Sequence, residues 1–255
     1  MNQADLIARI AAYWDERIHD LAITTHPVGT PGFFQQLYEY RYDKLNYLPR
    51  LVDFAGYTGK HLLEVGCGAG IDLVRFAKGG ANVTGIDLSK TAIDLARRNF
   101  EQSEQQADLR VMNGEHMQFA DHTFDVVYAH GVLQYTSDSA KMIAEIYRVL
   151  KPGGQLIAMV YNRISWLNLM RNVTRVPLEH EDAPVLEKFS IGELKQLLHP
   201  FHDYRIIPER FPVETKLHSG WKARLFNNVF VKVFNLLPRR WVRPFGWHLM
   251  AFAVK

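Results

Sequence analysis

The chain has 255 residues, of which 47% are apolar and 22% are charged. This composition is typical of a globular protein that buries a sizeable core. No apolar run reaches the roughly 18 to 20 residues of a membrane-spanning helix, and the first residues lack the layout of a signal peptide, so we expect a cytoplasmic protein. Its single cysteine, Cys67, excludes an internal disulfide.

Charge is unevenly distributed along the chain. The formal net charge is +3, yet residues 215–255 hold eight Lys or Arg and no Asp or Glu. Such a basic segment fits an anionic partner, although a solvated basic face is its more frequent meaning. The basic residues alternate with Phe and Val, which argues against a nucleic-acid channel, so we expect no nucleic-acid partner.

The N-terminal residues 1–58 are predicted to form a helical cap. Apolar residues at helical spacing predict a helix over 4–20, the Pro- and Gly-rich stretch 26–32 breaks it, and a second helix over 33–48 follows. Aromatic residues crowd the first half of the second helix. We interpret most of them as packing residues.

From residue 60 onward, strands and helices alternate at short intervals. Strands are predicted near 61–65, 82–86, 108–112, 124–129, 155–161, 203–207 and 248–254, and helices near 70–78, 89–104, 138–150 and 190–198. This alternation predicts an α/β fold with a doubly wound sheet. The Lys-Pro-Gly-Gly stretch 151–154 is predicted to be the turn before the fifth strand, and Ser190 with Glu193 has the spacing of a capping box.

An insertion at about 210–245 separates the last two predicted strands. It contains an amphipathic helix around 222–237, with apolar residues on one side and Arg, Lys and Asn on the other. One interpretation is a lid packed on the domain. In the other, the helix makes weak contact with a membrane surface, and Phe226, Phe230 and Phe234 meet the lipid.

Three short stretches follow consecutive predicted strands, and the carboxyl ends of parallel strands meet at one edge of a sheet. The first, 64–70, has three alternating glycines, which predict a sharp turn whose backbone lies close to a ligand. The second stretch contains Asp87, whose carboxylate can accept hydrogen bonds from both hydroxyls of a ribose. Asn113 begins the third, where an amide and backbone groups can read an adenine edge.

Together these stretches resemble the class I S-adenosylmethionine-dependent methyltransferases, especially the branch similar to ubiquinone/menaquinone C-methyltransferases. The resemblance covers about residues 60–161. It implies a seven-stranded Rossmann-like sheet, with S-adenosyl-L-methionine as cofactor and S-adenosyl-L-homocysteine as product. The cofactor-binding residues that it implies are Glu64, Gly66, Cys67, Gly68, Gly70, Asp87, Leu88, Asn113, Gly114, Glu115 and His130. Asn113 departs from the family, which commonly has Asp there, but an amide oxygen can still accept the bond from adenine.

Dinucleotide-binding oxidoreductases share the glycine-rich turn. Their fingerprint requires glycine at the position that Ile71 occupies in this chain. The acids and amide after the next two strands therefore favour S-adenosylmethionine over a dinucleotide. A degenerate fold that binds the cofactor without activity is a further alternative.

Few residues qualify for chemistry. A methyl group on a sulfonium is already activated, so an enzyme mainly positions the acceptor, while a hydroxyl or carbon acceptor also needs a base. His130 and Tyr135, at the end of the fourth predicted strand, are the catalytic candidates. The substrate-contact candidates in the cap are His26, Tyr40, Arg41 and Tyr42. We expect no metal site, because the pair His199 and His202 is interrupted by proline and lacks suitable carboxylates.

The sequence thus predicts one compact domain, with the cap at 1–58, a cofactor-binding core at 59–162 and the C-terminal half of the sheet with its lid insertion at 163–255. The predicted activity is methyl transfer by in-line displacement to an O, N or C atom of a small molecule. The alternatives are a non-catalytic S-adenosylmethionine-binding regulatory module and a peripheral-membrane methyltransferase acting on a lipid-like or quinone substrate.

Overall fold

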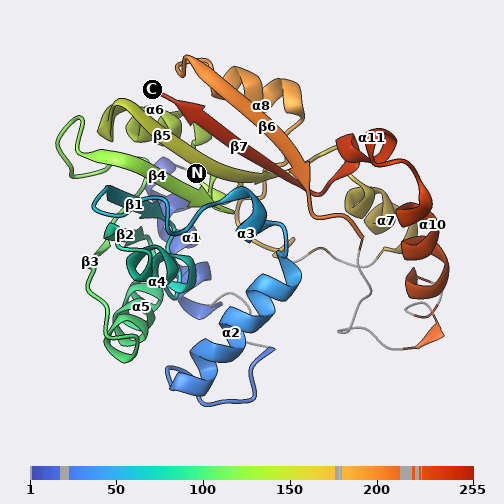
Figure 1. Ribbon diagram of the computed structural model, residues 1–255, viewed down its shortest axis with the longest axis horizontal. Helices are drawn as coiled ribbons and strands as arrows, with labels where there is room; N and C mark the ends of the chain where they lie inside the picture. Colours follow the sequence, from blue (N-terminus) through green and yellow to red (C-terminus); the bar gives the residue numbers. More distant parts are fainter. Residues whose placement is uncertain are drawn as a thin grey trace.

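A seven-stranded sheet runs through the molecule (Figure 1). The structure is a computed structural model that describes residues 2–17, 23–175, 178, 180–212, 220, 221, 224 and 226–255. The strands are β1 (His61–Val65), β2 (Asn82–Asp87), β3 (Asp108–Val111), β4 (Phe124–His130), β5 (Leu150–Tyr161), β6 (Asp203–Glu209) and β7 (His248–Val254). Their order in the sheet is β3-β2-β1-β4-β5-β7-β6. The predicted seven-stranded Rossmann-like α/β fold is confirmed.

Strands β1 to β5 pair in parallel, and β7 runs antiparallel to both of its neighbours, β5 and β6. The central strands are apolar on both faces, as parallel strands between two helical layers must be. β5 begins earlier than predicted, because Leu150 already pairs with Phe124. The Lys-Pro-Gly-Gly stretch is therefore an irregularity inside β5, where Gly153 takes a φ of 75°, and the prediction of a turn before the strand is wrong.

Helices cover both faces of the sheet. On one face, α4 (Ile71–Lys78) and α5 (Lys90–Gln102) bury Phe76 and Ile93, and on the other, α6 (Ser139–Val149) and α8 (Ile191–Leu197) bury Ile146 and Leu194. Ser190 and Glu193 form the predicted capping box of α8. These two apolar layers hold the strand ends in fixed positions, which is what a site built on strand ends requires.

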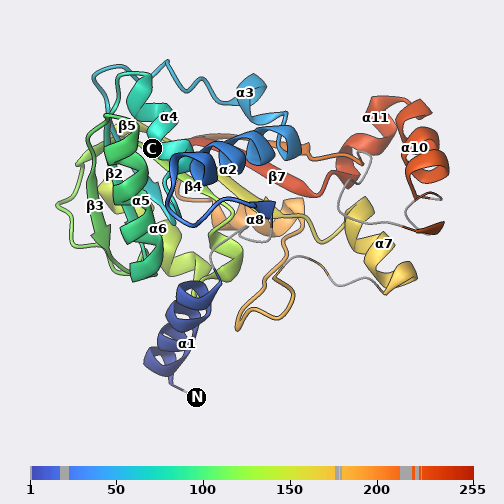
Figure 2. The same cartoon turned by 90° about the horizontal axis from the view of Figure 1, so that it is seen from below.

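The N-terminal region forms α1 (Gln3–Glu16), α2 (Pro31–Lys44) and the short α3 (Leu48–Leu51). Thr30 caps α2, whose first residue is Pro31, so α2 has a strong start signal. α2 ends four residues before the predicted position, and the predicted continuation of the first helix through 18–20 lies outside the described residues. Figure 2 shows α1 projecting from the body of the fold.

The C-terminal insertion builds a separate layer at one end of the sheet (Figure 1). It comprises a π-helix at Phe226–Val231, α10 (Lys232–Leu236) and α11 (Arg239–Val242), and it packs beside α7 (Trp166–Thr174), which precedes β6 in the chain. The predicted amphipathic helix around 222–237 matches the π-helix and α10, although residues 222, 223 and 225 lie outside the described part. Phe226, Phe230 and Phe234 pack against Trp166 of α7.

A buried ion pair fastens α2 to the sheet. Asp72, in the first turn of α4, is only 2% exposed. Arg41 of α2 donates to it through Nε, which lies 2.7 Å from Oδ1, and through Nη2. The hydroxyls of Tyr42 and Tyr128 also donate to this carboxylate, at 2.8 and 2.7 Å. The buried charge is therefore both paired and hydrogen-bonded, as a buried carboxylate must be.

Burial by itself would raise the pKa of the Asp72 carboxyl, but the charge and hydrogen bonds of Arg41 outweigh burial and lower the pKa to about 2. An unfolded aspartate has a pKa of roughly 3.9. Because the folded value is the lower one, the ionised carboxylate stabilises the fold above about pH 4, and this contribution disappears as the pH falls towards about 2.

We predict that Asp72→Asn lowers the free energy of unfolding by about 3 to 5 kcal/mol at neutral pH, because the Arg41 guanidinium loses its buried counter-ion. Urea denaturation should show this difference shrinking as the pH is lowered through the acid range. Asp94→Asn, at an exposed carboxylate, is the matched control. A difference that stays constant with pH would contradict the assignment.

Candidate active site

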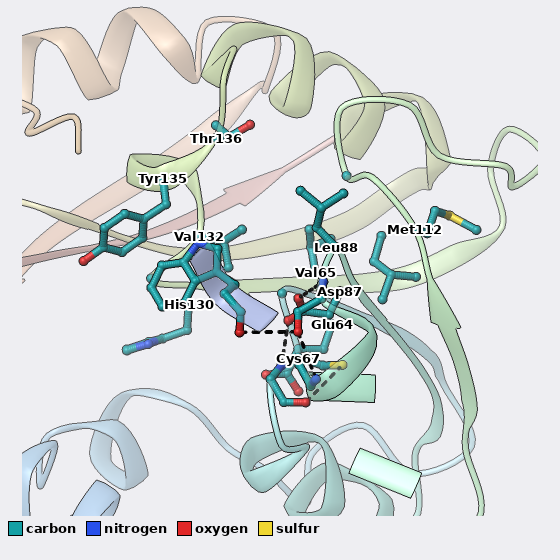
Figure 3. Close-up of a pocket in the computed structure, with 18 of the residues that line it drawn as sticks. Glu64, Val65, Cys67, Asp87, Leu88, Met112, His130, Val132, Tyr135 and Thr136 are labelled. Atoms are coloured by element: carbon teal, nitrogen blue, oxygen red, sulfur yellow. Dashed lines mark hydrogen bonds between the residues drawn. The ribbon is translucent and has the colours of Figure 1, made fainter. Parts of the chain in front are cut away.

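A large pocket lies beyond the carboxyl ends of β1, β2 and β4 (Figure 3). It is lined by residues of the stretches 64–72, 86–89, 112–115 and 130–136, together with residues of α1 and α2. The structure thus brings the three stretches singled out in the sequence to one edge of the sheet. Open α/β sheets bind their ligands at this edge.

The glycine-rich turn after β1 forms the floor of the pocket. Gly66 has a φ of 68°, and a Cβ there would lie 2.4 Å from a methyl carbon of Val132, so a side chain is excluded on both counts. Gly68 lines the pocket and has a φ of 53°, and no protein atom lies within 4 Å of the place that its Cβ would occupy. Gly70 does not line the pocket; it lets α4 begin close against Ala96 of α5.

Asp87 ends β2 and stiffens this turn. Its Oδ2 accepts from the backbone N–H of Gly68 at 2.9 Å, and its Oδ1 accepts from the N–H of Ser89, also at 2.9 Å. Each carboxylate oxygen can accept a further hydrogen bond, and Asp87 faces the pocket (Figure 3). The side chain can therefore hold the turn and two ligand hydroxyls at the same time.

Glu64 supplies a buried carboxyl group with an unpartnered oxygen. It is 4% exposed and lines the pocket, and its Oε2 has no hydrogen-bond partner among the described residues. Burial, reinforced by the neighbouring Asp72, raises the pKa of Glu64 well above its ordinary value. A cationic ligand in the pocket would give this carboxyl the partner that the protein does not.

The third predicted stretch lines the opposite wall. The Oδ1 of Asn113 accepts from the backbone N–H of Glu115 at 2.9 Å, which leaves the amide one further lone pair and two N–H donors. Glu115 is 3% exposed, and its carboxylate accepts from Thr136 and from the backbone N–H of Ser137. Sequence reasoning gave Glu115 a ligand role, whereas its observed contacts tie the 136–138 loop to the site. Gly114 lines the pocket between the two.

Cys67 and Leu88 complete the cofactor set taken from the resemblance, and both line the pocket. Burial raises the pKa of the Cys67 thiol well above its ordinary value, with Asp87 adding to the effect. Cys67 is therefore a neutral thiol at physiological pH, and its contribution is shape rather than nucleophilic attack.

His130 ends β4 on the far side of Asp87 from Met112 (Figure 3). Its Nδ1 lies 3.3 Å from Arg41 Nη2, and its Nε2 lies 3.3 Å from the Tyr47 hydroxyl. A guanidinium only donates, so Nδ1 must carry its lone pair, and the proton of a neutral His130 sits on Nε2. The only lone pair that His130 could offer to a substrate proton is the one that faces Arg41.

Tyr135 lies beside His130 in the pocket but is held by aromatic neighbours. Its hydroxyl donates to the hydroxyl of Tyr161 at 3.3 Å. Its ring meets the ring of Trp14 edge to face, with 5.1 Å between the centroids. The Tyr135 ring can therefore form a wall of the pocket, while its hydroxyl belongs to a contact with β5.

Among the four substrate-contact candidates of the cap, only Arg41 lines the pocket. Tyr42 turns its hydroxyl to Asp72, Tyr40 lies over the Lys44 ammonium, and His26 sits in an exposed turn against Gly32. No described residue of 163–255 lines the pocket, so closure of the insertion over a substrate stays a prediction.

The residues that sequence reasoning missed lie on α1. Ile7, Ile10 and Trp14 line the pocket from one face of this helix, and Arg17, just after its end, and Leu37 of α2 join them. Their spacing of three or four residues was the signal, because it marks one apolar face of a helix. The sequence did not show that this face meets a pocket rather than the core.

Polar contacts fix the position of α1. The Oδ1 of Asp15 accepts from the hydroxyl of Ser89 at 2.7 Å and from the backbone N–H of Thr91 at 3.0 Å, both at the start of α5. Two residues after Asp15, Arg17 forms an ion pair with Asp182. The Asp182 carboxylate also accepts a hydrogen bond from the Tyr13 hydroxyl at 2.9 Å. α1 therefore bridges the cofactor edge of the sheet and the segment around Asp182.

Known proteins share both the sequence core and the fold. Residues 63–158 match the family model described as "Methyltransferase domain". The chain is 35% identical over 136 residues to a ubiquinone biosynthesis O-methyltransferase of Aromatoleum aromaticum, covering 52% of this chain and 56% of the relative. A protein with the same name from Pseudomonas aeruginosa is 38% identical over 110 residues, covering 43% and 47%. The chain thus spans about half the length of the curated relatives it matches.

Solved structures extend the likeness to nearly the whole fold. A Thermotoga maritima S-adenosylmethionine-dependent methyltransferase, described as a possible histamine N-methyltransferase, superposes with a TM-score of 0.62 at 17% identity, covering 96% of this chain and 99% of that one. An S-adenosylmethionine-dependent methyltransferase from Aquifex aeolicus gives a TM-score of 0.57 at 16% identity, covering 88% and 98%.

The chain has the Rossmann-like fold of S-adenosylmethionine-dependent methyltransferases. Its residues 63–158 match a methyltransferase domain, and the likeness in sequence applies to that part of the chain. S-adenosylmethionine is the cofactor of the class, and the pocket fits it: Asp87 suits the ribose, Asn113 the adenine, and the unpartnered Glu64 a cationic methionine moiety. Among the described residues, no group of His, Cys, Asp and Glu could hold a metal ion.

We predict that Asp87→Ala weakens the binding of S-adenosylhomocysteine by more than about 1.5 kcal/mol, because charge-assisted hydrogen bonds are lost. Isothermal titration calorimetry measures the change. Asp94→Ala, at an exposed carboxylate of α5, is the control and should bind like the wild type. Equal affinities for Asp87→Ala and the wild type would refute the role of Asp87.

Proposed function

We propose that this chain transfers the methyl group of S-adenosylmethionine to a hydroxyl oxygen of a small apolar or aromatic molecule. One observation carries the proposal: α1 adds the apolar side chains of Ile7, Ile10 and Trp14 to the pocket that contains the glycine-rich turn, and we call the part that they line the chamber. His130 and Arg41 line the same pocket, so it suits a molecule with an apolar body and a polar group.

Aromatic side chains support a flat acceptor. The rings of Trp14 and Tyr135 meet edge to face at one wall of the chamber, and such rings pack well against a further aromatic ring. The curated relatives are named as O-methyltransferases, which supports oxygen as the acceptor atom. The sequence motifs alone had pointed towards the C-methyltransferase branch.

S-adenosylmethionine supplies a methyl group that is already activated on its sulfonium. The protein then has to hold the acceptor in line and exclude water, and such positioning contributes on the order of 7 to 11 kcal/mol. An acceptor hydroxyl that replaces Arg41 at Nδ1 of His130 would meet the lone pair of that nitrogen, which can take up the hydroxyl proton. Arg41, displaced by a small distance, would remain beside the oxygen as it gains negative charge.

The function is tested by incubating the protein with methyl-labelled S-adenosylmethionine and matched pairs of hydroxylated and amino-substituted aromatic compounds. We expect labelled ether products from the hydroxylated members. Products from the amines alone would overturn oxygen as the acceptor atom. Binding of S-adenosylhomocysteine without product from any compound or from cell extract would instead support a non-catalytic cofactor-binding module.

We further predict that His130→Gln lowers kcat by about 10² to 10⁴, the usual contribution of a general base. The KM for the acceptor should change much less than kcat, because a base acts on the proton that is transferred in the reaction. His116→Gln, an exposed histidine in the 113–116 stretch, is the matched control. A raised KM with little change in kcat would show that His130 only positions the acceptor.

A further inference from the structure

The C-terminal insertion exposes a second apolar surface, which we name the distal patch. It consists of Val229, Val233, Leu236, Leu237 and Trp241, with exposed fractions of 50, 54, 83, 41 and 60%. Val229, Val233 and Leu236 follow one another at helical spacing on the π-helix and α10, while Leu237 is the C-cap of α10 and Trp241 lies in α11. Large apolar side chains exposed together, rather than singly, mark an interaction surface.

This patch is not the apolar face that the sequence pattern indicated. Phe226, Phe230 and Phe234 lie on the other side of the helix, where they stack on one another and on Trp166. Phe234 is only 9% exposed. The phenylalanines therefore hold the insertion on α7, with Phe226 and Phe230 only partly buried, and their contact with lipid stays a prediction.

Basic residues frame the patch. Lys232, Arg240 and Arg243 are exposed beside it, and the Arg240 guanidinium lies 5.8 Å from the centroid of the Trp241 ring. No Asp or Glu occurs anywhere in 215–255. Tryptophan, leucine and arginine on one exposed face form the pattern of helices that lie in the interface of a membrane with negative lipids.

We infer that the distal patch docks the protein on the surface of an anionic lipid bilayer. Leu236 and Trp241 would enter the boundary between headgroups and acyl chains, and Arg240 and Arg243 would meet lipid phosphates. A second copy of the chain is a poorer occupant, because a two-fold contact would set the arginines of one patch against those of the other. No described helix is long and apolar enough to cross a membrane, so the contact is peripheral.

Vesicle flotation of the full chain tests the inference. We expect the wild type to float with phosphatidylcholine vesicles that contain phosphatidylglycerol, and not with pure phosphatidylcholine. Leu236→Ser combined with Trp241→Ser should weaken this binding about tenfold or more, because two membrane-inserted side chains are lost. Arg240→Gln combined with Arg243→Gln should weaken binding to a similar degree and reduce its sensitivity to salt.

Val111→Ser is the matched control, because Val111 is 50% exposed on β3 at the far edge of the sheet. It should float like the wild type, and circular dichroism should show that all variants are folded. Absence of flotation, or equal flotation of the Leu236→Ser/Trp241→Ser protein, would overturn the inference. So would patch-dependent dimerisation without lipid binding. No cofactor or acceptor is added, so the result is independent of the proposed methyl transfer.

Discussion

The structure depends on the buried carboxylate of Asp72. Three elements are joined at this carboxylate: α4 carries Asp72 itself, and α2 and β4 contact it through Arg41 and Tyr128. A carboxylate that is 2% exposed is stable only while its donors stay in place. Because Arg41 also reaches Nδ1 of His130 at 3.3 Å, the charge that holds the cap on the sheet also orients the imidazole in the pocket. The Arg41 guanidinium therefore contributes both to the stability of the fold and to the geometry of the site.

The Arg41 guanidinium is the first of five side chains that contact one another in a row: Arg41, His130, Tyr47, His248 and Arg210. Each of the five groups offers one hydrogen to the row, but only four contacts link them. At the other end of the row, Arg210 donates to Nε2 of His248 at 3.0 Å. Burial lowers the pKa of His248 well below its ordinary value, so the ring is neutral and carries a single proton. Because Nε2 accepts, that proton sits on Nδ1, which lies 2.5 Å from the Tyr47 hydroxyl. His130 also points its proton at Tyr47, whose pKa burial raises. The mismatch falls on the longer contact, the 3.3 Å between Tyr47 and His130. The contact with His130 is therefore the weaker of the two contacts that Tyr47 makes in this row.

The parts of the site that sequence reasoning found are those with a local signal. A glycine-rich turn after an apolar strand and an acid after the next strand are readable over a few residues, and parallel topology then brings them to one edge. The acceptor side has no such signal. Trp14 reaches Tyr135 across more than a hundred residues of sequence, and Tyr47 meets His130 and His248 from a third segment. Helical spacing showed that α1 has an apolar face, but only tertiary packing decides what that face covers.

The C-terminal insertion is a second region where the sequence pattern alone did not predict which side chains would be buried. In a uniform α-helix, apolar residues at 226, 229, 230, 233, 234 and 237 form one broad stripe, and the sequence therefore predicted one apolar face. The first turns are a π-helix, which has more residues per turn and shifts the stripe relative to an α-helix. α7 covers only the half of the stripe that contains the phenylalanines. The aliphatic half remains exposed, in a segment whose charged residues are all Lys or Arg. Apolar side chains exposed together in this way mark an interaction surface, which the sequence pattern alone did not reveal.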